Sequence, residues 1–151
     1  MKLAEALLLR AENKNKIENL QHRILANIKV QEGEKPLENP QGLIDEAFGL
    51  NEQLCTLIKQ INHCNSTTKL PTGQTLSEAI VERDMLMKKR NILSAVAAKT
   101  LEQNYRFTHT EVKMNVAVSV EDIQKQIDAL SKQFRELDVQ IQALNWTTDL
   151  P

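Results

Sequence analysis

The feature that most constrains this chain is a run of apolar residues spaced alternately three and four apart along its last long segment. The run consists of Val120, Ile123, Ile127, Leu130, Phe134, Leu137, Ile141 and Leu144. An earlier run has the same spacing and consists of Leu43, Ala47, Leu50, Leu54, Leu57, Ile61 and Cys64. Such spacing is typical of a helix that packs lengthwise against another helix. The sequence therefore predicts an all-α fold in which long helices lie side by side.

Four helices are expected, and local signals set their starts. The predicted ranges are about 3–28, 40–63, 76–103 and 120–145. Pro40 suits a first helical turn, and Thr75 with Glu78 three residues later has the pattern of a capping box. Ser119 precedes an acidic first turn and is the expected cap of the last helix.

The segment from Tyr105 to Ser119 differs in pattern from the helices. From Glu111 onward apolar and polar residues approximately alternate, which makes this segment the one strand candidate of the chain. A single strand cannot pair its own backbone groups, so three arrangements stay open: a short hairpin, pairing with a second subunit, or an extended arm over the helices. The expected fold is an elongated antiparallel bundle of about four long helices, with one extended or short β arm near 105–119. We expect a single domain over residues 1–151.

Composition and charge narrow the class of protein. Aromatic residues make up only 3% of the chain, so aliphatic side chains must form the core, as suits helix seams. Nineteen basic and twenty acidic residues give a formal net charge of −1, and nucleic-acid binders usually carry a basic excess. The first residues lack the pattern of a signal peptide, and no apolar stretch reaches the length of a membrane helix. We therefore expect a cytoplasmic protein that does not bind nucleic acid.

Candidate catalytic and metal-binding residues have simpler explanations. Cys55 and Cys64 lie about 13 Å apart along one predicted helix, which is too far for a disulfide, so free thiols are expected. His63 and Cys64 are adjacent and point about 100° apart on a helix, so they do not chelate a metal together easily. His22 and His109 are not accompanied by a recognisable catalytic pattern, and the glycines do not form a phosphate-binding motif. We expect no enzyme activity, no cofactor and no metal.

Two features could carry an interaction. The first is a charged cluster between helices, formed by Glu5, Arg10, Arg83, Asp84 and Arg90. It could receive an anionic ligand, but an ion-pair network that fixes the register of the helices needs fewer assumptions, and we favour it. The second is Trp146, which is expected either to anchor an interface or to cap its own bundle.

Several stretches together resemble the septicolysin-like family of bacterial proteins. They are MKLAEALLLRA, KVQEGEKP, LPTGQTLSEAIVERD and LNWTTDL, which span nearly the whole chain. The family name implies a haemolytic, pore-forming toxin, although most members are uncharacterised, and the resemblance assigns no catalytic residue.

Taken together, the observations favour a non-enzymatic, cytoplasmic homo-oligomer that buries between subunits an apolar face left open by each chain. One alternative is the pore-forming toxin that the resemblance implies, which would act on membranes. A second alternative is a helical arm that binds RNA. The sequence does not indicate a small-molecule ligand.

Overall fold

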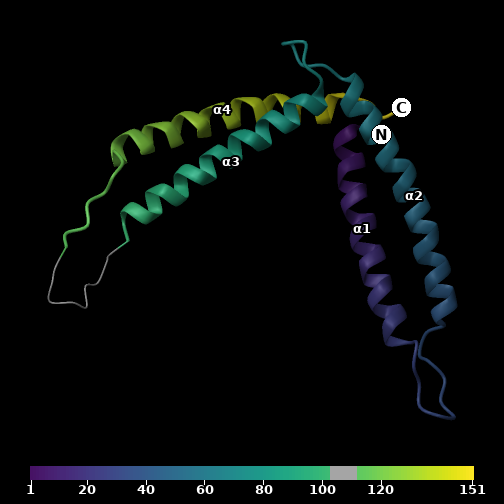
Figure 1. The fold of residues 1–151 in the computed structure, drawn as a ribbon. Helices are drawn as coiled ribbons and strands as arrows, with labels where there is room; N and C mark the ends of the chain where they lie inside the picture. Colours follow the sequence, from purple (N-terminus) through teal and green to yellow (C-terminus); the bar gives the residue numbers. More distant parts are fainter. Residues whose placement is uncertain (103–111) are drawn as a thin grey trace. The chain divides into compact units, whose positions relative to one another are not determined.

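The computed structural model describes residues 1–102 and 112–151, and in them the predicted all-α fold with four helices is confirmed (Figure 1). The helices are α1 (Leu3–Ala26), α2 (Pro40–Thr67), α3 (Leu76–Thr100) and α4 (Val120–Thr147). The chain divides into two compact units. Unit 1 comprises Met1–Ser77 and Gln142–Pro151, and unit 2 comprises Glu78–Ile141. The single domain stays a prediction.

Helix starts follow the signals in the sequence. At the start of α2 the side chain of Asn39 accepts a hydrogen bond from the backbone of Gln41 at 3.1 Å. At the start of α4 the hydroxyl of Ser119 accepts one from the backbone of Asp122 at 3.3 Å. These side chains satisfy donors that have no partner inside the helix, so both starts agree with the prediction.

Helix α2 is longer than predicted, because its polar last turn remains helical. The predicted helix ends near His63, but α2 continues to Thr67. The hydroxyls of Ser66 and Thr67 both donate to the carbonyl of His63, at 2.8 and 2.9 Å. Hydroxyl groups that bond back to their own helix leave the backbone helical, although the same residue types also favour turns.

Unit 1 has a closed apolar core. Helix α1 packs against α2, and a tight turn that follows α2 adds two more buried leucines. Five of the seven apolar residues predicted along α2 are buried. The buried apolar residues of unit 1 are Leu3, Ala4, Ala6, Leu20, Leu43, Leu54, Leu57, Ile61, Cys64, Leu70 and Leu76. Two helices alone cannot enclose so many side chains, so the turn and the chain ends complete the core.

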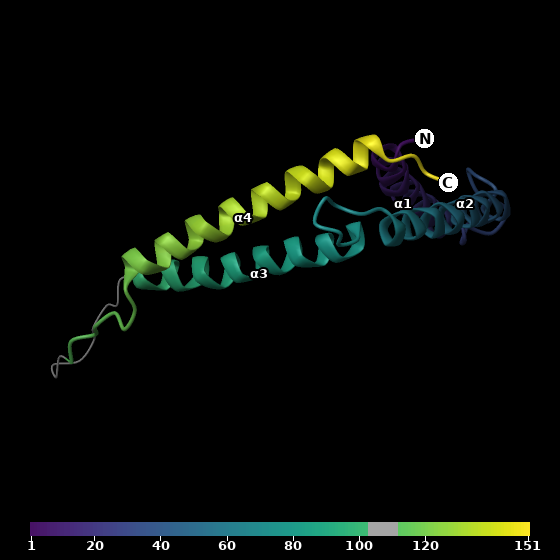
Figure 2. The ribbon, with the colours of Figure 1, turned by 90° about the horizontal axis from the view of Figure 1, so that it is seen from above.

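The two chain ends pair with each other within unit 1, as both views of the ribbon suggest (Figures 1 and 2). Lys2 and Asp149 form an antiparallel bridge, and their side chains form an ion pair at 2.8 Å. The hydrogen bond that Lys2 donates lowers the pKa of the Asp149 carboxyl. Gln60 of α2 also donates to the carbonyl of Pro151 at 2.9 Å. The ends are thereby held against the last turns of α2.

The connection from α1 to α2 is held by a polar cluster. The guanidinium of Arg23 donates two hydrogen bonds to the carboxylate of Glu38, one of them at 3.1 Å from Nε. The buried Asn27 accepts from the backbone of Glu38 at 3.1 Å and donates to the carbonyl of Arg23 at 2.8 Å. This arrangement fixes the long connection at the point where it joins α2.

In unit 2 the described arm is not a strand. Residues 112–117 have no regular secondary structure, and the β-bridges of the described residues lie elsewhere, at Lys2–Asp149 and Lys69–Thr75. Residues 103–111 of the predicted arm lie outside the described residues. Alternation alone does not make a strand, because a strand needs a neighbour for its backbone groups, so pairing of this arm with a second subunit stays a prediction.

The core of unit 1 predicts a contrast between two substitutions. Ile61 is fully buried, so Ile61→Ala should lower the free energy of unfolding by about 3 kcal/mol. Phe48 lies on the same helix but is 68% exposed, so Phe48→Ala should change it by less than about 1 kcal/mol. Urea unfolding followed by circular dichroism measures both. Equal losses would contradict the placement of the core.

The Arg23–Glu38 pair predicts a titration. The hydrogen bonds from Arg23 lower the pKa of Glu38, so the pair stabilises the fold above the ordinary glutamate pKa. That contribution is lost as the pH falls through the lowered pKa. Carboxyl NMR should find the pKa of Glu38 below its ordinary value, and Arg23→Gln should return it toward that value. An unchanged pKa in the variant would show that Arg23 is not the cause.

Candidate interaction surface

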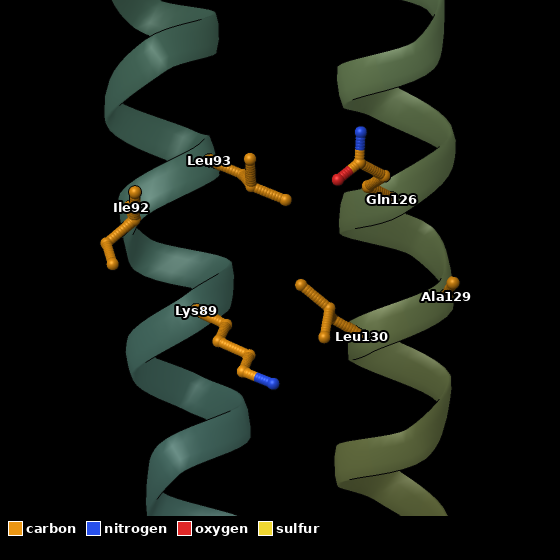
Figure 3. A pocket seen from close by; sticks show the side chains of 6 residues that line it. All are labelled: Lys89, Ile92, Leu93, Gln126, Ala129 and Leu130. Atoms are coloured by element: carbon orange, nitrogen blue, oxygen red, sulfur yellow. The ribbon is translucent and has the colours of Figure 1, made fainter.

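Helices α3 and α4 pair within unit 2, and their contact residues follow a seam on each helix. Figure 3 shows Leu93 of α3 and Leu130 of α4 pointing toward one another. On α3 the seam continues at steps of three and four through Ala79, Arg83, Leu86, Arg90, Leu93 and Ala97. Two of these six positions hold arginine. Both arginines are partly buried between apolar neighbours.

Arg83 finds its partners on both helices. Its Nη1 donates to Asp138 of α4 at 2.9 Å, and its Nη2 lies 3.2 Å from the carboxylate of Asp84. The side chain of Arg83 is 21% exposed, so the pair with Asp138 is partly shielded from water. Of the predicted charged cluster, the structure thus joins Arg83 to Asp84. Asp138 was missed, because its role depends on the antiparallel register of two helices.

Arg90 lacks a carboxylate partner among the described residues. Its Nε is buried without a hydrogen bond, and its Nη1 donates only to the sulfur of Met87, at 3.9 Å. Asp138 and Ser131 are seven residues apart, and so are Arg83 and Arg90. In the antiparallel register Arg90 therefore comes level with Ser131, where Arg83 has an aspartate.

The other predicted site residues lie in unit 1. The carboxylate of Glu5 accepts a hydrogen bond from the backbone of Lys2 at 2.6 Å, so it caps the first turn of α1. Arg10 is partly exposed, and in the described part of the chain it forms no ion pair with Glu5. Trp146 is 57% exposed, which leaves its role as an interface anchor a prediction.

A mostly apolar hollow of about 450 Å³ lies between α3 and α4. Its lining residues are Lys89, Ile92, Leu93, Gln126, Ala129 and Leu130 (Figure 3). A second hollow, of about 510 Å³, lies between the last turns of α3 and the described part of the arm, Met114 to Val118. Unit 2 therefore leaves apolar surface open beside its own helix pair.

Helix α3 also carries apolar residues on a side away from its seam. Val81, Met85 and Ile92 are 58%, 43% and 64% exposed, at steps of four and seven residues. Helical geometry places this set on one side of α3, which we call the outer stripe. The outer stripe could have been found from the sequence, but Lys88 and Lys89, which lie between Met85 and Ile92, interrupt the apolar spacing.

Metal and membrane sites receive no support from the described residues. Within residues 1–102 and 112–151, no group of three or more His, Cys, Asp or Glu side chains is placed to hold a metal ion. Cys55 and Cys64 are free thiols, as predicted. A helix both long enough and apolar enough to cross a bilayer is absent from the same residues.

Comparison with known proteins gives a family. Residues 10–150 match the family described as "Family of unknown function (DUF6847)". The chain belongs to this family. A similar solved structure is the crystal structure of a functionally unknown conserved protein from Corynebacterium diphtheriae. It is 38% identical, with a TM-score of 0.93 over 100% of this chain and 99% of that one. No curated protein matches.

The ion pair of Arg83 predicts a measurable coupling. Arg83→Met and Asp138→Asn should each lower the free energy of unfolding by about 1 kcal/mol, because each removes the partly buried ion pair that joins α3 to α4. The double variant should lose less than the sum of the two single variants. Urea unfolding of the four proteins gives the coupling energy, and strictly additive losses would show that the pair contributes nothing.

Proposed function

We propose that this protein is a non-enzymatic interaction module of the cytoplasm, which forms a homo-oligomer through unit 2. A scaffold of this kind needs a surface that is apolar and incompletely covered in the single chain. The pair of α3 and α4 meets that description.

The unequal burial of two equivalent seams is the observation that carries the proposal. The seam of α2 has five buried residues of seven, whereas the seam of α4 has two of eight, Ile127 and Ile141. Both have the same spacing, so both suit helix packing. A second copy of unit 2 would cover apolar surface that the pair of α3 and α4 leaves open.

Charge does not oppose this association. The formal net charge of the chain is −1, so two copies repel each other only weakly. Exposed apolar residues of unit 2 are also found outside the seam of α4. They include the outer stripe and the lining of the apolar hollow of about 450 Å³.

The membrane-active alternative is supported by one feature, the apolar residues of the arm. Val112, Met114, Val116 and Val118 are all exposed, and such a segment could dip into a lipid surface. The septicolysin-like resemblance stays a prediction, and lipid binding is its test. We prefer the homo-oligomer, because it accounts for the helix pair as well as for exposed apolar residues.

A concentration series in the analytical ultracentrifuge tests the proposal. The purified protein should sediment as a discrete oligomer, with or without liposomes of mixed neutral and anionic lipids. A monomer at all concentrations would overturn the proposal, and a monomer that assembles only on liposomes would favour the membrane-active alternative.

Two variants of equal exposure locate the interface. Ile92 in unit 2 is 64% exposed and Leu25 in unit 1 is 65% exposed. Ile92→Asp should convert the oligomer to monomer, because it places a charge in an apolar interface, and Leu25→Asp should leave it unchanged. If Leu25→Asp dissociated the oligomer and Ile92→Asp did not, the interface would lie in unit 1 instead.

A further inference from the structure

We infer that the outer stripe of α3 packs antiparallel against the same stripe of a second copy, with Glu82 of each chain beside Lys89 of the other. This inference rests on the proposed homo-oligomer and names the contact that builds it. It is argued from the spacing of the stripe, from the order of the charges beside it, and from two exposed charges, Glu82 and Lys89, that form no ion pair within the described residues.

The spacing of the stripe suits a helix partner. Its full course, at steps of three and four, is Glu78, Val81, Met85, Lys88, Ile92, Ala95 and Lys99. Glu78 and Lys99 stand at its ends, and the residues between them are apolar apart from Lys88. Because the seam of α3 already faces α4, the stripe needs a helix from outside the pair.

The charges along the stripe change sign near its centre. Acidic residues precede Met85, namely Glu78, Glu82 and Asp84, and the basic residues Lys88, Lys89 and Lys99 follow it. In a parallel pair about a two-fold axis, Lys89 would come beside Asp84 of the second copy, which already pairs with Arg83 of its own chain, and Glu82 would come beside Ser77. An antiparallel copy about a two-fold axis instead places acids beside bases at both ends, which is a self-complementary arrangement.

The register follows from the apolar residues. When Val81 of one copy is level with Ile92 of the other, Met85 is level with Lys88, whose methylene groups can cover it. In antiparallel helices with this alignment, Glu82 and Lys89 become neighbours at the edge of the contact. The two-fold axis repeats each of these contacts once.

The two edge residues are available for this pairing. Glu82 and Lys89 are exposed, and in the described part of the chain neither forms an ion pair, whereas the neighbouring Arg83 is held by Asp138 and Asp84. Lys89 also borders the hollow that Ile92 and Leu93 line, so a second α3 on the stripe would lie beside that hollow (Figure 3).

Charge reversal tests the contact. Glu82→Lys and Lys89→Glu should each raise the dissociation constant of the oligomer about tenfold or more, because each replaces two attractive pairs with repulsive ones. The double variant restores opposite charges at both sites, so its dissociation constant should return to within about threefold of the wild-type value. Lys59→Glu, an exposed reversal on α2, is the control and should have no such effect.

The outcomes separate this inference from the proposed function. An oligomer that is insensitive to both single reversals, or a double variant as weak as the single ones, would overturn the antiparallel stripe and leave the homo-oligomer standing. A wild-type monomer would overturn both. Circular dichroism of each variant should show unchanged helicity, since both residues are exposed.

Discussion

A pair of helices can bury only the sides that face each other, and the rest of this structure follows from that limit. Unit 1 overcomes it by adding a turn and both chain ends to the pair of α1 and α2, so Leu70 and Leu76 join a closed core. In unit 2, Ala79, Ile127 and Ile141 are the buried apolar residues, and most others on α3 and α4 stay partly or largely exposed. We therefore assign self-association to unit 2, which buries fewer of its apolar residues than unit 1.

The two arginines within the seam of α3 differ in whether a carboxylate meets them. Arg83 can occupy its position because Asp138 meets it across the pair, and this ion pair fixes one register of α3 against α4. Arg90 has no such partner in the described chain, and its Nε is buried in the seam without a hydrogen bond. The order of acids before bases along α3 then favours an antiparallel neighbour over a parallel one.

Much of the fold could be predicted from the sequence, because its signals are local. Helix starts depend on caps such as Asn39 and Ser119, which act within one turn. The end of α2 was placed too early, since the same hydroxyls can favour a turn or bond back to their own helix. The partner of Arg83 and the unequal burial of the two seams depend on contacts between segments far apart in the chain. Spacing alone could not distinguish those seams, and the outer stripe was overlooked.

Distances between spin labels test whether α3 of one copy lies antiparallel to α3 of another. Single labels at Asn91 and Ala98, both exposed, in a Cys55→Ser background would report the distance between copies. Each residue away from the two-fold axis adds about 3 Å between labels in an antiparallel pair, so the distance should grow by up to about 20 Å from Asn91 to Ala98. Equal distances at the two sites would indicate parallel helices and contradict the account.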